Sequence, residues 1–250
     1  MSKFYLRALI VGAIAFSSAR ALALTTSNLL LNPGAELGTG NDAGSTVTDW
    51  TVGGTSNPGR DNGSFDGFPV HSGSYDFYGG SGSIYPDQSP NPAGSLSQTV
   101  NLLTSGLSAS GIDSGDDTLN VEFFERSLDQ DQTPLNDAAS VTVVFLNGSL
   151  TPLPGGYNSG EVSNITLPWQ EVDGSDLIPP TARYFDYTMN FFLNAGTDVD
   201  AFVDDNSATV TTTPATISAV PLPPAAYTAL AWLGVLLGVK ICRDRFAAAR

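Results

Sequence analysis

Aromatic rings beside amide and carboxylate groups are the residues of this sequence best suited to binding chemistry. Flat rings stack on the apolar faces of sugars, while Asn, Asp and Gln side chains can hydrogen-bond sugar hydroxyl groups. Trp169 lies between Pro168 and Gln170 in a stretch that is typical of a loop. The alternative for any single ring is a half-buried position that caps the protein core. The candidates for sugar stacking are Trp169, Tyr75, Tyr78, Tyr85 and Tyr157.

Acidic side chains dominate the central part of the chain. Between Leu24 and Val220 there are 24 acidic residues against three basic ones, so the net charge of this part is −21. Such a surface repels phosphate backbones, which excludes nucleic-acid binding. It favours divalent cations instead, above all Ca²⁺, because Ca²⁺ binds carboxylate and carbonyl oxygens. The three basic residues are Arg60, Arg126 and Arg183.

Catalytic chemistry has little support in the sequence. A glycosidase needs two carboxyl groups about 5 to 10 Å apart, but with 24 acids some such pairs arise by chance. His71 is the only histidine, Cys242 is the only cysteine, and no G-x-S-x-G nucleophile elbow is present. Arg126, close to Glu122 and Glu125, is interpreted as a surface ion pair. We therefore expect no enzyme, and a polysaccharide-active enzyme is the remote alternative.

Three features follow one another at the C-terminus. A proline motif is followed by an uncharged apolar run from Ala225 to Val239 and then by a short basic end. With Ile241 and Cys242 the run can cross about 30 Å of hydrocarbon at about 1.5 Å per residue. A single transmembrane helix is expected over 225–242, with the basic end in the cytoplasm. The proline motif is Val220, Pro221, Leu222, Pro223 and Pro224, and the basic end holds Lys240, Arg243, Arg245 and Arg250.

This order of features resembles the PEP-CTERM class of sorting signals, and VPLPP is close to its VPLPA variant. The resemblance implies a Gram-negative bacterial protein that an exosortase-type enzyme processes near the proline motif. A plain membrane anchor is the alternative. At the other end, Lys3 and Arg7, the apolar stretch Ala8 to Phe16 and the A-x-A site Ala21 to Ala23 indicate a signal peptide. Signal peptidase and an exosortase are thus the expected processing partners.

These signals divide the chain into four parts. A signal peptide covers 1–23, a folded domain 24–210, a Thr- and Pro-rich linker 211–219 and the sorting signal 220–250. The expected location lies beyond the bacterial inner membrane, at the cell surface or in the extracellular matrix. Before processing, the C-terminal helix would hold the protein in the inner membrane.

Strand signals are frequent in the central domain, and helix signals are nearly absent. Alternating apolar and polar residues predict strands, and clusters of Gly, Pro, Asn, Asp and Ser between them predict turns. About eight strands with this spacing predict an all-β fold, an antiparallel jelly-roll β-sandwich. Without cysteines, such a domain depends on core burial, helped by a bound metal. The predicted strands are Thr118–Arg126, Ser140–Leu146, Tyr184–Leu193, Val47–Val52, Ser74–Tyr78, Leu96–Leu102, Val162–Leu167 and Ala201–Val210.

The two ends of this domain resemble galactose-binding-like jelly rolls, a superfamily that includes carbohydrate-binding modules. The opening matches at Asn28 to Gly40 (NLLLNPGAELGTG) and Trp50, and the closing strand at Asp200 to Asp205 (DAFVDD). Gly94 to Leu102 also fits the usual order, so the resemblance spans about Asn28 to Val210. Asn206 departs from the pattern, which usually has an apolar residue there, and this leaves the register of the last strand open.

The resemblance implies a structural Ca²⁺ that ties the first loop to the last strand. Glu36 and Asp204 would supply carboxylates, and backbone carbonyls near Asn32 to Gly38 would complete the shell. The alternative is that both carboxylates only accept hydrogen bonds from loop N–H groups. The resemblance also implies that Trp50 is a core residue.

Together these features predict a non-enzymatic, secreted protein of the cell envelope or extracellular matrix, sorted through its C-terminal signal. The alternative is a glycan-binding module that recognises exopolysaccharide through exposed aromatic rings. Exopolysaccharide is therefore the expected ligand class, and Ca²⁺ the expected structural ion.

Overall fold

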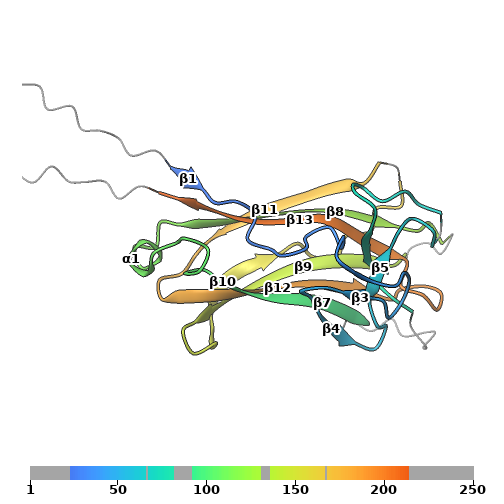
Figure 1. Ribbon diagram of the computed structural model, residues 1–250, viewed down its shortest axis with the longest axis horizontal. Coiled ribbons are helices and arrows are strands. Elements are labelled where there is room, and N and C mark those ends of the chain that lie inside the picture. Colours follow the sequence, from blue (N-terminus) through green and yellow to red (C-terminus); the bar gives the residue numbers. More distant parts are fainter. Residues whose placement is uncertain (1–22, 66, 82–91, 131–135, 167, 214–250) are drawn as a thin grey trace, which may run out of the picture. The chain divides into compact units, whose positions relative to one another are not determined.

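The computed structural model describes residues 23–65, 67–81, 92–130, 136–166 and 168–213. These residues form two large β-sheets that pack face to face and a separate two-stranded ribbon, with one short helix, α1 (Ala109–Ile112), at one end of the sandwich (Figure 1). Within this part of the chain, no helix is long and apolar enough to cross a membrane. The predicted signal peptide, the sorting motif and the helix expected over 225–242 lie outside the described residues.

Sheet 1 has the strand order β11–β8–β13–β6–β5, with β1 paired to the far end of β13. Its strands are β1 (Leu24–Thr25), β5 (Gly59–Asp61), β6 (Asp76–Tyr78), β8 (Thr118–Ser127), β11 (Gln170–Leu177) and β13 (Ala201–Thr212).

Sheet 2 has the order β10–β9–β12–β7–β4, and a separate two-stranded ribbon joins β2 to β3. The strands of sheet 2 are β4 (Thr51–Gly54), β7 (Gly94–Asn101), β9 (Ala138–Asn147), β10 (Pro152–Asn158) and β12 (Ala182–Phe192), and the ribbon is β2 (Gly38–Thr39) with β3 (Thr46–Val47).

The chain crosses between the sheets at nearly every connection after β7. Strands β8, β11 and β13 belong to sheet 1, and β7, β9, β10 and β12 belong to sheet 2. Every strand pairing is antiparallel. The predicted all-β antiparallel sandwich is confirmed, and the alternation between layers is the connectivity that a jelly roll requires.

The core lies between the two sheets and follows from the period-2 pattern of the longest strands. Alternate residues of β12 point inward and are fully buried, and alternate residues of β8 face them from sheet 1. Each such ring or branched chain removes apolar area from water, which is the main stabilising term in a domain without disulfides. These inward residues are Phe185, Tyr187, Met189 and Phe191 on β12, and Leu119, Val121 and Phe123 on β8.

Two strand predictions were wrong. The run Val47–Val52 is interrupted, because Asp49 has a positive φ of 70° and separates β3 from β4. In the run Val162–Leu167, Val162 makes an isolated bridge to Ala139, and the Asn164 side chain accepts the Thr166 N–H in a turn. Strands β5, β10 and β11 were missed, since they are rich in Gly, Pro and charged residues, which are depleted in strands.

Trp50 is a core residue, as the resemblance implied. Its side chain is 8% exposed and packs edge-on against Phe77 and Tyr187, with ring centroids 5.1 and 6.0 Å away. The indole Nε1 donates a 3.0 Å hydrogen bond to the carbonyl of Asn32. Trp50 therefore ties the first loop of the domain to the sandwich core.

Candidate functional site

The outer face of sheet 1 carries the candidate site. Alternate residues of its middle strand β8 point away from the core and lie beside outward residues of β13 and β11. The resulting rows run from polar residues at one end to aromatic and charged residues at the other. On β8 these residues are Asn120, Glu122, Phe124 and Arg126; on β13 they are Thr209, Ser207, Asp204 and Phe202; on β11 they are Ser175, Asp173 and Glu171.

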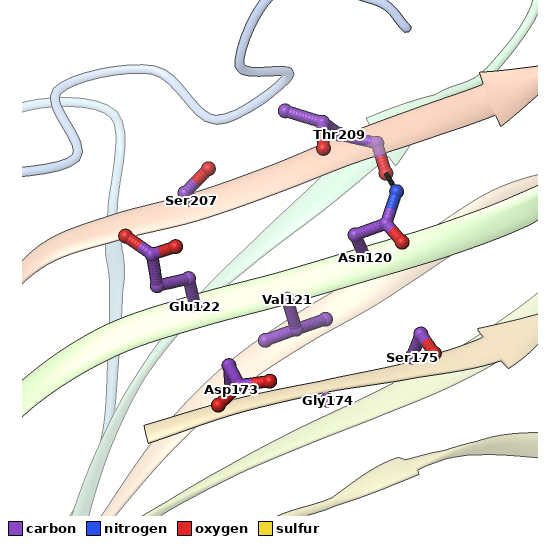
Figure 2. A pocket seen from close by; sticks show the side chains of 8 residues that line it. All are labelled: Asn120, Val121, Glu122, Asp173, Gly174, Ser175, Ser207 and Thr209. Carbon is purple, nitrogen blue, oxygen red and sulfur yellow. Dashed lines mark hydrogen bonds between the residues drawn. The ribbon is translucent and has the colours of Figure 1, made fainter. Parts of the chain in front are cut away.

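A polar groove of about 230 Å³ lies at the first end of this face. Three adjacent strands supply its walls, and Figure 2 shows their side chains gathered around the hollow. The Asn120 amide donates to the Thr209 carbonyl and, at 3.0 Å, to the Thr211 hydroxyl. These hydrogen bonds hold the Asn120 side chain in place on one side of the groove. The groove is lined by Asn120, Val121, Glu122, Asp173, Gly174, Ser175, Ser207 and Thr209.

Two carboxylates face each other in the polar groove. Glu122 and Asp173 are direct cross-strand partners, both exposed, and neither side chain makes a hydrogen bond within the described residues. Like charges directly opposite each other destabilise a sheet, so this pair offers acceptors that suit hydroxyl donors or a cation. A glycosidase acid lies in an apolar enclosure, whereas both of these side chains are exposed. The arrangement suits binding better than catalysis.

An aromatic patch of His71, Phe124 and Trp169 adjoins the polar groove. The His71 ring stacks on Phe124 at 3.8 Å and meets Trp169 edge-on at 5.9 Å. His71 belongs to residues 67–75, here called the cover segment, which also accepts a 3.2 Å hydrogen bond from the Trp169 indole at the carbonyl of Pro69. Trp169 is half-buried, so part of its ring remains available to a ligand.

Two of the other predicted sugar-stacking residues are half-buried rings. Tyr75 is covered by the Arg60 guanidinium, whose central carbon lies 3.7 Å from the ring centroid. Tyr157 packs against the core, and Gly174 is required beside it, because a Cβ at that position would overlap the ring. Burial, followed by the nearby Asp173 charge, raises the pKa of Tyr157. Both rings fit the alternative interpretation, in which they cap the core.

The prediction for Tyr78 was wrong. Its side chain is 0% exposed, because Phe65 covers it at 4.6 Å and Phe202 stacks beside it at 5.4 Å. No ring face is left for a sugar, so Tyr78 is a packing residue. Tyr85 lies outside the described residues.

A row of buried carboxylates lies further along sheet 1. Asp61 of β5 pairs with Asp76 of β6, and the register of β6 with β13, continued by one residue, puts Asp204 beside Asp76. All three are almost completely buried. Burial above all, and then the charges of Asp205 and Glu36, raises the pKa of Asp204 to about 7. Burial and the charges of Asp204 and Asp61 raise the pKa of Asp76, whose Oδ1 has no hydrogen-bond partner among the described residues.

The carboxylates hold the cover segment onto the sheet. Asp204 Oδ2 accepts the Ser72 N–H at 3.0 Å, and Glu36 Oε1 accepts the N–H groups of Ser74 and Tyr75 at 2.8 and 3.1 Å. The structure thus brings Glu36 and Asp204 to the same short segment, although they are far apart in sequence. The hydrogen bonds from loop N–H groups that the alternative interpretation expected are present.

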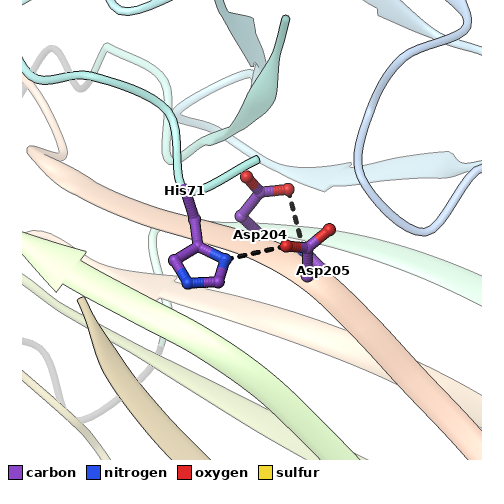
Figure 3. Close-up of side chains that lie close together, drawn as sticks. All are labelled: His71, Asp204 and Asp205. Atoms are coloured by element: carbon purple, nitrogen blue, oxygen red, sulfur yellow. Dashed lines mark hydrogen bonds and ion pairs between the residues drawn. The ribbon is translucent and has the colours of Figure 1, made fainter. Parts of the chain in front are cut away.

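His71 and Asp205 extend this cluster at the surface. His71 Nδ1 lies 2.7 Å from Asp205 Oδ2, and one donor atom each from His71, Asp204 and Asp205 lies within 4.8 Å of the others (Figure 3). Sequence reasoning missed His71, Asp205, Asp61 and Asp76 as site residues. Only the strand register, which joins segments distant in the chain, places them together.

Asn206 explains the departure noted in the closing strand. A bulge lies between Asp204 and Ser207, and the Asn206 side chain turns inward. Its amide donates to the carbonyl of Pro33 at 3.1 Å, and its oxygen accepts the Tyr187 hydroxyl at 2.8 Å. The polar residue therefore fastens the first loop to the core where an apolar residue could not.

No protein-family model matches the chain, and no curated protein matches it. Among solved structures, a family 61 carbohydrate-binding module in complex with β-1,4-galactotriose is 18% identical, with a TM-score of 0.46, over 72% of this chain and 97% of that one. The C-terminal family 22 carbohydrate-binding module of Clostridium thermocellum Xyn10B is 12% identical, with a TM-score of 0.40, over 69% and 89%.

The enzymatically active domain of tailspike protein 4 from bacteriophage CBA120 is also similar. It is 12% identical, with a TM-score of 0.44, over 72% of this chain, and this chain spans 21% of it. At these TM-scores and identities, the similarities assign neither a ligand nor a site to this chain.

The buried carboxylates predict an unusual dependence of stability on pH when divalent ions are removed. The pKa of Asp204, raised to about 7 by burial, lies above its value in the unfolded chain, so the folded state binds more protons between about pH 4 and 7. The free energy of unfolding should therefore fall as pH rises through this window. In EDTA we expect Tm at pH 8 to lie about 5 °C or more below Tm at pH 5.

Two variants separate the sources of this effect. Asp204→Asn should flatten the profile, while Glu125→Gln tests an independent contribution, because burial raises the pKa of Glu125 to about 7 as well. A Tm that rises steadily from pH 5 to pH 8 in EDTA would contradict the prediction.

Proposed function

We propose that this protein is a non-catalytic glycan-binding module that holds its ligand on the outer face of sheet 1. The observation that carries the proposal is the open polar groove, with its two unpaired carboxylates, on the same face of sheet 1 as the half-exposed ring of Trp169, which lies two outward positions before Asp173. Sugar recognition needs this combination of a flat apolar surface and hydrogen-bonding groups at one place.

The chemistry of the face divides between its two parts. In the aromatic patch, Trp169 stacks on the apolar face of a sugar ring, and its position is fixed by the hydrogen bond to Pro69. In the polar groove, the carboxylates of Glu122 and Asp173 accept hydrogen bonds from hydroxyl groups, while the Ser175 and Ser207 hydroxyls can donate or accept. The face therefore suits an extended chain of sugars, as exopolysaccharide would provide.

We propose further that the row of buried carboxylates, Asp61, Asp76 and Asp204, holds a structural Ca²⁺. The donors fit the ion: Asp61, Asp76 and Asp204 are buried together with an Asp76 oxygen that has no partner. The neighbouring Arg60 does not pair with these carboxylates. Its guanidinium donates to the backbone carbonyls of Gly40, Ala35 and Glu36 instead. Ca²⁺ would supply the positive charge that this part of the fold lacks, with Glu36 and Asp204 among its ligands.

We also propose that the protein is secreted and sorted through its C-terminal signal. Support comes from the co-occurrence of the proline motif at 220–224, the apolar run and the basic end. The glycan-binding face would then serve at the cell surface or in the matrix.

Replacement of Trp169 tests the binding face. Trp169→Ala should weaken glycan binding at least about fivefold, because loss of an aromatic anchor costs about 1 to 2 kcal/mol or more, and should leave Tm nearly unchanged. Trp50→Ala is the contrast, since it should lower the free energy of unfolding by about 3 to 5 kcal/mol. Binding is measured on a broad glycan array with Ca²⁺ and then by calorimetry.

A matched control lies on the other sheet. Val144, 40% exposed on the outer face of sheet 2, can be replaced by Ala without an effect on binding. If no glycan is retained, glycan binding is wrong; if Trp169→Ala binds like the wild type, the proposed face is wrong. A turnover assay on any bound polymer tests the absence of catalysis.

Ca²⁺ should raise the Tm of the purified domain, and more strongly at pH 8 than at pH 5, because protons compete for the same carboxylates. A ligand at a hundred times its Kd adds about 2.7 kcal/mol to the free energy of unfolding. Mg²⁺ should have a smaller effect, and Glu36→Gln or Asp76→Asn should remove the difference between the ions. Equal stabilisation of wild type and variants by both ions would mean general screening of charge and no specific site.

The exported protein shows whether the C-terminus is processed. Mass spectrometry of surface material should find the domain without peptides from residues 246–250. Abundant recovery of these peptides on the exported domain would instead support a plain membrane anchor.

A further inference from the structure

Arg126 is a buried cation that pairs with no carboxylate of the described residues. Its side chain is 5% exposed, and neither Nε nor Nη1 has a hydrogen-bond partner within this part of the chain. The ring of Phe68, from the cover segment, lies 3.8 Å from the central carbon of the guanidinium. The surface ion pair expected with Glu122 or Glu125 is not formed. Glu125 points inward instead and accepts the Ser127 hydroxyl and the Asn164 N–H at 2.6 and 2.8 Å.

The other two arginines of the described chain are satisfied. Arg60 donates to three backbone carbonyls, and Arg183 forms a two-pronged pair with Asp113, with both N···O distances at 3.0 Å. A buried charge is costly unless it is paired and hydrogen-bonded. A domain with 24 acidic residues has no shortage of carboxylates for pairing. The missing partner of Arg126 is therefore a specific feature of this position.

The position of Arg126 connects it with the binding face. It lies on the same outward row of β8 as Phe124 and Glu122, at spacings of two residues. Trp169 lies one residue before Gln170, the partner of Glu125, so the register of β11 with β8, continued by one residue, puts Trp169 opposite Arg126. A sugar chain that stacks on Trp169 and extends along the face to the polar groove therefore begins beside Arg126.

The guanidinium suits one class of ligand group. Its planar fork of N–H donors matches a carboxylate in a bidentate pair. Within a glycan, a uronic-acid residue supplies such a carboxylate. Exposed charges further away than about 8 to 10 Å are largely screened at physiological salt, so the acids that oppose this contact are the nearby ones, Asp204 and Glu171, at the next outward position along the sheet.

We propose that Arg126 binds the carboxylate of a uronic-acid residue in an acidic glycan, after the Phe68 side chain moves from its face. The proposal rests on the glycan-binding face described above and adds the charge class of its ligand. Phe68 covers the guanidinium in the ligand-free protein and protects it from water through a cation–π contact. The ligand then replaces that contact with two charge-assisted hydrogen bonds.

The binding experiment compares sugars that differ only in charge. Oligogalacturonates and oligoglucuronates are titrated into the whole domain beside their methyl esters, with Trp fluorescence and calorimetry as readouts. The wild type should bind the free acids at least about tenfold more tightly than the esters. Arg126→Gln should bind both forms equally, and Arg126→Lys should keep only part of the preference. Arg183→Gln, which changes a half-buried arginine on sheet 2, should behave like the wild type.

A stability measurement separates a ligand-binding arginine from a structural one. Arg126→Met removes an unpaired buried charge and keeps most of the side-chain volume, so Tm without ligand should rise by about 2 to 4 °C. A variant that gains stability while it loses acid binding supports the proposal. A fall in Tm of similar size would show that Arg126 is a structural residue and would overturn it.

The remaining outcomes distinguish the role of Arg126 from the more general proposal that sheet 1 binds glycans. If free acids and esters bind equally to the wild type, or if Arg126→Gln keeps the preference for acids, the role of Arg126 is wrong while glycan binding stands. If neither the acids, the esters nor neutral oligosaccharides bind, both proposals are wrong.

Discussion

The buried carboxylate of Asp204 is the constraint on which the outer face of sheet 1 depends. It lies in the middle of the sheet, opposite Phe124 of β8 and next to Asp76 of β6, and is completely buried. Burial of this charge requires donors or a cation around it. The Ser72 N–H supplies one such contact, and through it the cover segment is held over the sheet. The aromatic patch exists because that segment brings His71 against Phe124.

Polar contacts also join the first loop to the last strand in this cysteine-free domain. Asn206 binds the carbonyl of Pro33, and the Asn28 side chain donates to the carbonyl of Asn206 and accepts the N–H of Ala208. The Trp50 indole bonds to Asn32 from the other side of the loop. These contacts occupy the place that a disulfide has in many secreted domains. Through these contacts, the opening and closing segments of the domain are held together in the fold.

The sequence predicted most of the sandwich, because the long strands show a clear alternation of apolar and polar residues. Strand β12 alternates Phe185, Tyr187 and Met189 with polar residues, and the structure follows that alternation. Strand β11 was missed, since QEVDGSDL has little β propensity and forms only as an edge beside β8.

The site was less predictable from sequence, because it depends on which residues the strand pairing brings side by side and on which side chains a distant segment covers. Trp169 could be chosen as a surface ring from its neighbours in sequence, but Asp61 and Asp76 meet Asp204 only through strand pairing. Tyr78 lies on a strand face that would be exposed without Phe65 above it. Arg126 has acidic neighbours in sequence, yet alternation along β8 turns Glu125 to the opposite side of the sheet. In each case the deciding contact comes from a segment distant in the chain.

The position of β13 has a mechanical consequence. The strand runs through the middle of sheet 1, pairs with β8 along most of its length, and ends at Thr212 beside Leu24 of β1 (Figure 1). A force applied along the chain at Thr212 is directed along β13, parallel to its neighbours. The hydrogen bonds to β8 are then loaded together in shear, whereas a force across the sheet would open them one after another. Under the proposed function, in which sheet 1 binds polymer and the chain is held beyond Thr212, the β13–β8 pairing would carry the tension.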